Sequence, residues 1–285
     1  MAAAYALIAA FLFGAALVTT QFGLRHMDGM AGAKISIPSG AALFCLLLPV
    51  RGLEGWNGAG AAMFLALGLF FPVMVTLLAY AANRRLGPTI AGAIGSTAPL
   101  FAVLGAMLFL GETLGIFQGA AILAIVLGSV VLVWRRGATA GVHGAGPGSW
   151  MAWGAAALRA LAQVGVKAGL LLWPNPYAAA LLCYAVSVAT IWTIGAFSRR
   201  PQSRIYTRRG VMWFVLTGLL NGTAVLALYT ALESGSVKIV SPIASSYPLF
   251  TLVLNAVVLR EERISARLMA GVALMVSGVV LLLVL

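Results

Sequence analysis

The sequence predicts an all-α membrane protein in which ten transmembrane helices form two inverted repeats of five helices each. Two observations support this fold class. About 62% of the 285 residues are apolar and only 8% are charged, whereas soluble domains carry roughly 25% charged residues. The second half of the chain also matches the first half at an offset of 149 residues.

Ten apolar segments account for almost the whole chain. A hydrocarbon core about 30 Å thick is spanned by roughly 20 apolar residues in a helix, and each segment has about this length. Residues 1–24 contain no Lys or Arg, so we interpret the first segment as a mature helix and not as a signal peptide. The segments are 3–23, 31–50, 58–82, 87–110 and 114–134, then 150–173, 176–198, 211–232, 236–259 and 266–285.

Both halves of the chain carry the same motif before their last predicted span. The first half contains STAPLF at 96–101, followed by LGE at 110–112. The second contains SSYPLF at 245–250, followed by LRE at 259–261. Because each half has an odd number of spans, the second half enters the membrane upside down. Inverted repeats are typical of secondary transporters, which bind their substrate near the midplane, where the repeats meet.

The repeat divides the chain into three parts. Residues 1–134 form the first five-helix repeat, and residues 150–285 form the second. A Gly- and Ala-rich stretch at 135–149 separates them and has the composition of a flexible linker.

Basic residues cluster at one end of the predicted bundle. Thirteen of the eighteen Lys and Arg residues fall in connections after odd-numbered helices, whereas we find only Arg51 on the opposite side. This asymmetry follows the positive-inside rule. It explains the net charge of +12 without nucleic-acid binding, and it places both termini outside the cytoplasm. The thirteen are Arg25, Arg84, Arg85, Arg135, Arg136, Arg199, Arg200, Arg204, Arg208, Arg209, Arg260, Arg263 and Arg267.

At its repeated motifs the chain resembles the drug/metabolite transporter superfamily, in its ten-helix EamA-type branch. The resemblance rests on the Pro-Leu-Phe segments and their endings at 99–112 and 248–261, on Gly68 and Gly218, and on Trp153-Gly154. It implies a metabolite transporter of the bacterial inner membrane, often an exporter of amino acids or similar solutes. The superfamily also moves nucleotide sugars, phosphorylated sugars and cationic drugs.

The chain departs from this family pattern at two places. Phe13-Gly14 stands where Trp-Gly is common, and Lys34 stands where many relatives carry an arginine early in the second helix. Lys34 lies close to a helix start, so snorkelling of its side chain to the membrane surface is an alternative to a role in the site.

A polar stripe marks the fourth and ninth predicted helices. Lys238, Ser241, Ser245 and Pro248 fall on one helical face. A proline in mid-helix removes a backbone hydrogen bond, and the neighbouring hydroxyls are then available to a cavity. Close packing of small residues is the alternative. The candidate binding residues in these two helices are Ser96, Thr97, Pro99, Lys238, Ser245, Ser246, Tyr247 and Pro248.

One charged residue is predicted to lie near the midplane. Arg159 stands about nine residues into the sixth helix, where a charge costs roughly 2.5 kcal/mol or more unless it faces a cavity or a partner. We therefore predict that it binds substrate, with bonding to backbone carbonyls as the alternative. Gln163, Tyr184 and Asn221 are also polar at mid-span and are candidates for lining the same cavity.

The positions of the acids constrain the substrate. All six Asp and Glu residues fall at helix ends or in connections, so no carboxylate is available at membrane depth to exchange a proton for a cation. The site is therefore predicted to favour a carboxylate, a zwitterion or a phosphate over an organic cation. Facilitated diffusion or exchange is the simpler mechanism.

The sequence argues against an enzyme. Its two histidines, His26 and His143, lie in connections, and we find no pattern for a nucleophile with a base or for a metal site. We expect no cofactor and no metal. The expected partners are a small-molecule solute and the lipid bilayer, with no nucleic acid, and a homodimer is left open. Two alternatives stay open: a transporter or exchanger of phosphorylated or nucleotide-linked metabolites, and a non-transporting scaffold or receptor.

Overall fold

The computed structural model describes the chain except residues 134–148, 198–205, 260–265 and 285. It also leaves out the side chains of 80, 83–84, 87–93, 133, 197 and 256–259. Most of the predicted linker, part of the Arg-rich connection after the seventh span, and the LRE motif beyond Leu259 therefore lie outside the described residues.

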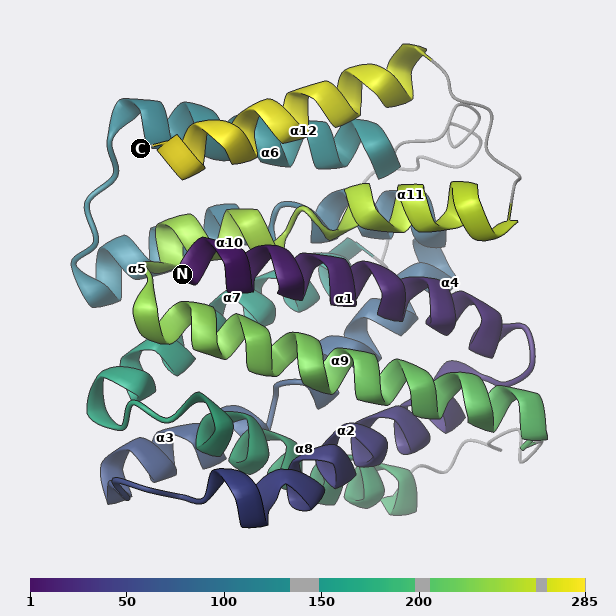
Figure 1. The fold of residues 1–285 in the computed structure, drawn as a ribbon. Helices are drawn as coiled ribbons and strands as arrows, with labels where there is room; N and C mark the ends of the chain where they lie inside the picture. Colours follow the sequence, from purple (N-terminus) through teal and green to yellow (C-terminus); the bar gives the residue numbers. More distant parts are fainter. Residues whose placement is uncertain (134–148, 198–205, 260–265, 285) are drawn as a thin grey trace.

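Every regular element in the described ranges is helical (Figure 1). Eight stretches are long and apolar enough to cross a bilayer, and two shorter apolar helices lie at 98–110 and 116–132. The all-α membrane fold is therefore confirmed. The helices are α1 (Ala2–Leu24), α2 (Gly29–Arg51), α3 (Gly58–Gly68), α4 (Val73–Gly95), α5 (Ala98–Leu110), α6 (Ile116–Val133), α7 (Ser149–Leu172), α8 (Pro176–Phe197), α9 (Arg208–Ser234), α10 (Val237–Ala244), α11 (Tyr247–Leu259) and α12 (Ala266–Val284).

The two helices that carry the repeated motif are both interrupted, at equivalent positions. The first break lies at 96–97, between α4 and α5, and the second at 245–246, between α10 and α11. Pro99 and Pro248 each stand second in the helix that follows. Proline has no backbone N–H to donate, so it is tolerated in the first turn of a helix but not in its interior.

The third predicted span differs from the structure. It is divided at 69–72, because Pro72 has no N–H with which to continue α3. The connection expected at 83–86 lies inside α4 and is itself helical. Ala and Arg, which are good helix formers, supply most of the residues just before and within this connection.

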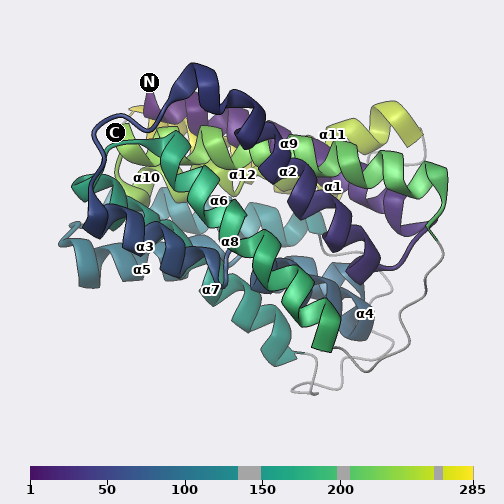
Figure 2. The same cartoon turned by 90° about the horizontal axis from the view of Figure 1, so that it is seen from below.

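The main helix pairs join one repeat to the other. α1 packs against α9 and α11, and α7 packs against α4 and α5. α2 packs against α9, whereas α8 packs against α3 (Figures 1 and 2). Each contact therefore has a counterpart with the roles of the repeats exchanged, as inverted repeats require.

Matching glycines bring two of these pairs together. A Cβ at Gly68 would lie 2.8 Å from the carbonyl oxygen of Cys183 in α8. A Cβ at Gly218 would overlap the carbonyl oxygen of Ser36 in α2. Only glycine allows the backbones to approach so closely, and small residues are used in this way between membrane helices.

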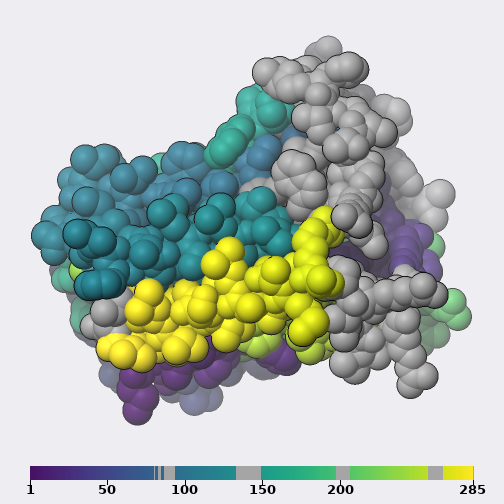
Figure 3. Space-filling model, turned by 90° about the horizontal axis from the view of Figure 1, so that it is seen from above, coloured from purple at the N-terminus to yellow at the C-terminus, as the bar shows by residue number. Residues whose placement is uncertain are grey.

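α6 and α12 lie side by side along one face of the molecule (Figure 3). Their glycines are again equivalent. A Cβ at Gly128 would lie 2.7 Å from the backbone nitrogen of Met275, and a Cβ at Gly278 would lie 2.7 Å from the carbonyl oxygen of Ala121. This pair joins the last helix of each repeat.

The two ends of the bundle differ in charge. Both termini lie at one end, which we call the terminal end (Figure 1). The α1–α2 connection and the starts of α9 and α12 lie at the opposite end, which we call the basic end. The described residues of the basic end include Arg25, Arg208, Arg209 and Arg267.

Candidate functional site

A cavity of about 190 Å3 lies between helices of both repeats. A cavity needs roughly 10–15 Å3, measured in this way, to hold one water molecule, so there is room for a small solute. The wall is mostly apolar, with few polar side chains. The lining residues are Phe13, Ala16, Leu17, Thr20, Ser36, Ile37, Phe71, Pro72, Val75, Thr76, Ala79, Arg159, Ala162, Gln163, Tyr184, Asn221, Val225, Leu228, Tyr229, Ala244, Ser245 and Tyr247.

The cavity lies at mid-depth and extends toward the basic end. On α1 it reaches Thr20, four residues before the end of that helix. On α10 it contacts only the last residue, Ala244, and on α9 it stops at Tyr229, five residues before the end. The first turns of α1 and α10 and the last turn of α9, which lie at the terminal end, therefore do not line the cavity.

Six residues predicted for the site are brought together around this cavity: Arg159, Gln163, Tyr184, Asn221, Ser245 and Tyr247. The others lie elsewhere. Ser96, Ser246, Pro99 and Pro248 are buried in helix contacts outside the lining, and Thr97 is half-buried. Of the two breaks, the second therefore contributes polar groups to the cavity and the first does not.

The two breaks are nevertheless built in the same way. The Thr97 hydroxyl donates to the carbonyl oxygen of Ile94 at 2.6 Å, and the Ser246 hydroxyl donates to the carbonyl oxygen of Ile243 at 2.7 Å. Each hydroxyl supplies a hydrogen bond to a carbonyl near the end of its helix, where intrahelical partners are missing. The break at 245–246 then places Ser245 and Tyr247 at the cavity.

Arg159 is half-buried and faces the cavity from the middle of α7. Its Nη1 donates to the Tyr247 hydroxyl at 3.5 Å, which is long for a hydrogen bond. Among the described residues, this is the one hydrogen bond of the guanidinium, and the described lining contains no carboxylate. The positive charge is thus not neutralised by the described wall.

Gln163 follows Arg159 by one turn on the same face of α7. Its side-chain oxygen is fully buried and has no hydrogen-bond partner among the described residues. An unpaired buried acceptor costs about 1–3 kcal/mol. The cavity therefore combines a cationic donor with an unused acceptor one turn away.

The two predicted lysines lie outside the cavity lining. The Lys238 ammonium donates to the carbonyl oxygen of Thr113 at the terminal end. The Lys34 ammonium lies 5.8 Å from the ring centroid of Trp192, in a cation–π contact. Neither adds charge to the lining, so Arg159 is its one basic residue within the described part of the chain.

Sequence reasoning missed several lining residues. Thr20, Ser36 and Thr76 contribute hydroxyls, and Phe13 and Phe71 contribute rings. The hydroxyl of Thr20 also donates to the carbonyl oxygen of Ala16 in its own helix at 2.7 Å. Isolated hydroxyls of this kind are common in apolar helices, so they gave no signal in the sequence. Thr20 is the exception, because it lies in the polar run Thr19-Thr20-Gln21, which a search for polar positions in the first helix would find.

Comparisons with known proteins agree with this architecture. A family model for the EamA-like transporter family matches residues 1–134 and again residues 146–284. No curated protein sequence gives a significant match. A solved crystal structure with 18% sequence identity superposes with a TM-score of 0.81, covering 98% of this chain and 95% of the other, and at this identity it shows the fold alone. The protein is a multi-pass membrane transporter of small solutes, and the chain belongs to the EamA-like transporter family.

Proposed function

We propose that the protein exports amino acids or closely related carboxylate-bearing solutes across the bacterial inner membrane, by alternating access around the central cavity. The observation that carries the proposal is the Arg159 guanidinium at the cavity, whose described partner is the neutral hydroxyl of Tyr247. A guanidinium at membrane depth is costly unless its charge is compensated. A carboxylate on the solute would compensate it.

The shape of the guanidinium favours this class of solute. Its planar N–H groups match the two oxygens of a carboxylate, and charge-assisted hydrogen bonds of this kind are roughly twice as strong as neutral ones. An organic cation would instead meet like charge, because the described lining has no acid to receive it.

Gln163 supports a zwitterion over a simple carboxylate. Its side-chain oxygen can accept from an ammonium group. One helical turn separates it from Arg159, a spacing of about 5–6 Å that a compact α-amino acid can bridge. The apolar wall at Phe13, Phe71 and Val75 then suits an apolar side chain.

The alternative of a phosphorylated solute has less support. A phosphate carries up to two negative charges at neutral pH and is usually held by several cations. The two lysines that would have supplied them lie outside the lining. A scaffold or receptor without transport would not require a polar cavity shared by both repeats.

A thermal-shift screen of the purified protein tests the proposal. The matched series is an apolar α-amino acid, its amide, which lacks the carboxylate, and its N-acetyl derivative, which lacks the ammonium. A ligand that binds the folded protein raises the apparent melting temperature by mass action. We expect a shift with the free amino acid, a smaller shift with the N-acetyl derivative and none with the amide. If sugar phosphates or organic cations stabilise the protein and the free amino acid does not, the proposed substrate class is wrong.

A further inference from the structure

A glutamate in the first repeat caps a helix of the second repeat at the terminal end. Glu112 lies in the α5–α6 turn, after Gly111, whose φ of +66° ends α5. Its Oε1 accepts from the backbone N–H of Val237 at 2.8 Å, and its Oε2 accepts from that of Lys238 at 3.0 Å. These are the first two residues of α10.

This cap replaces one that α10 lacks. Ser236 stands at the N-cap position, but its side chain makes no capping hydrogen bond. The first N–H groups of a helix have no partner within the helix, and a carboxylate there is further favoured by the helix dipole. Glu112, from another part of the chain, therefore accepts the hydrogen bonds of the first N–H groups of α10.

Two lysines extend this contact. The Lys238 ammonium donates back to the carbonyl oxygen of Thr113, next to Glu112. The Lys167 ammonium, on α7, donates to the carbonyl oxygens of Leu232 and Glu233 at 2.8 and 3.3 Å, at the end of α9. The α5–α6 turn, α7 and the α9–α10 connection are thus joined at the terminal end.

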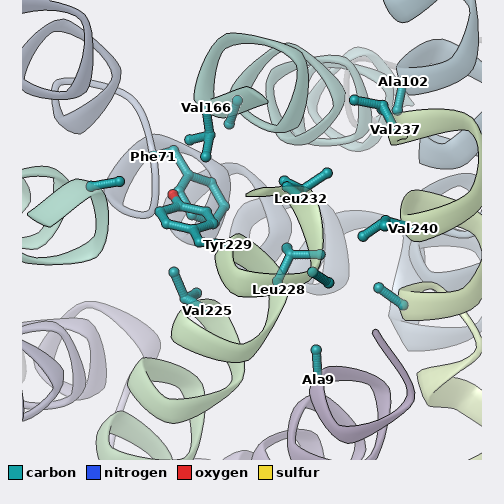
Figure 4. Close-up of a cluster of buried hydrophobic side chains, with 14 of the residues drawn as sticks. Ala9, Phe71, Ala102, Val166, Val225, Leu228, Tyr229, Leu232, Val237 and Val240 are labelled. Carbon is teal, nitrogen blue, oxygen red and sulfur yellow. The ribbon is translucent and has the colours of Figure 1, made fainter. Parts of the chain in front are cut away.

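Beneath this contact lies an apolar plug, which we define as Ala102, Val166, Leu232, Val237 and Val240 (Figure 4). All five side chains are 0% exposed. Val166 lies three residues beyond Gln163 along α7, and Leu232 lies three residues beyond Tyr229 along α9, in both cases toward the terminal end. The plug therefore separates the cavity from the Glu112 contact.

We propose that Glu112 is the latch of a gate at the terminal end. Its carboxylate holds α10 against the α5–α6 turn, and the cavity opens at this end only when those hydrogen bonds release. α10 has only eight residues and is separated from α11 by the break at 245–246, so it can move away as a short unit. The proposal rests on the proposed alternating access but applies whatever the solute is.

Cysteine labelling without substrate tests the latch. The background carries Cys45→Ala and Cys183→Ala, which remove both native thiols, and the reporter is Val240→Cys in the plug. Its reaction with a hydrophilic maleimide reports opening at the terminal end. We expect Glu112→Gln to raise the labelling rate about tenfold, the effect of losing one charge-assisted hydrogen bond. Glu54→Gln is the matched control, since Glu54 is an exposed acid at the same end.

A second reporter separates gating from loss of structure. Thr20→Cys lies on the basic side of the cavity, and its labelling should not rise in Glu112→Gln, whereas general unfolding would raise labelling at both positions. Lys238→Met weakens the same contact from the other side and should raise Val240→Cys labelling by a smaller factor. If both variants label like Glu54→Gln, or if both reporters rise together, the latch proposal is overturned. Because no solute is used, this outcome is independent of the amino-acid screen.

Discussion

Arg159 and Gln163 show what a sequence reveals about a membrane site at the scale of single residues. Both were predicted because a polar side chain within a long apolar run has an insertion cost that needs compensation, and both line the cavity. Lys238 met the same criterion but lies at the Glu112 contact. Its position depends on contact with the α5–α6 turn, which is more than 120 residues away along the chain. No local sequence pattern indicates that contact.

Replacing Arg159 should weaken transport without unfolding the protein. Losing a charge-assisted contact to a carboxylate costs about 1.5–3 kcal/mol, or roughly ten- to a hundredfold in affinity. We expect Arg159→Gln to reduce uptake of the amino acid by this factor, and Arg159→Lys to restore it only in part, because an ammonium cannot form the bidentate contact. Radiolabelled uptake into proteoliposomes measures both.

Arg209→Gln provides the control for this experiment, because Arg209 is exposed at the basic end and lies far along the sequence from the cavity lining of α9. Amino-acid uptake by the Arg209→Gln variant should match uptake by the unsubstituted protein. Normal uptake by a well-folded Arg159→Gln variant would mean that the arginine is structural, and the argument for an anionic group on the solute would lose its support.

At the scale of elements, the repeated proline motif predicted a missing backbone hydrogen bond within two continuous spans. The structure instead interrupts both helices, at the hydroxyl pairs that precede Pro99 and Pro248. The division of the third span at 69–72 was not predicted, although Pro72 was visible in the sequence. Residues 58–82 form an apolar run of normal spanning length, so the sequence analysis assigned them to one continuous helix despite Pro72. Prolines are tolerated in membrane helices often enough to make such a break hard to foresee.

The glycines between α6 and α12 should be intolerant of even a methyl group. In Gly128→Ala the new Cβ meets the backbone of Met275 at 2.7 Å, so the helices must separate. Such overpacking costs about 1–3 kcal/mol. Gly119→Ala, in the same helix, meets only a leucine methyl at 3.8 Å. Both substitutions gain about 1 kcal/mol in helix propensity. The difference in stability between the two variants therefore measures the packing cost at Gly128.

Thermal unfolding in detergent compares the two α6 variants. Gly128→Ala should melt at a lower temperature than the unsubstituted protein, and Gly119→Ala at an equal or higher one. Equal melting temperatures for the two variants would show that α6 and α12 do not pack as closely as the structure indicates.

For the whole molecule, the pairing of helices makes the two repeats interdependent. α1, α2 and α6 have their main partners in the second half of the chain, and α7, α8 and α12 have theirs in the first. The sequence predicted the repeats from the matching motifs, but not this exchange of partners. Pairing between helices in a bilayer depends on fine details of surface shape, which apolar composition alone does not specify.

This interdependence predicts that neither repeat is stable alone. Residues 1–134 and 150–285, expressed separately, should aggregate on extraction into detergent, whereas the two fragments expressed together should purify as one complex. Size-exclusion chromatography with circular dichroism distinguishes these results. A helical, monodisperse single repeat would contradict the account of the fold.

The central claim is that the protein carries a carboxylate-bearing solute by alternating access, and counterflow in proteoliposomes tests it most directly. Vesicles are preloaded with an excess of the unlabelled amino acid, and uptake of the labelled amino acid is followed over time. Alternating access predicts a transient overshoot above equilibrium, because the excess of unlabelled solute inside competes with the labelled solute for the site and slows its exit. The overshoot should disappear in Arg159→Gln. Uptake that rises smoothly to equilibrium and does not respond to the internal solute would contradict the claim.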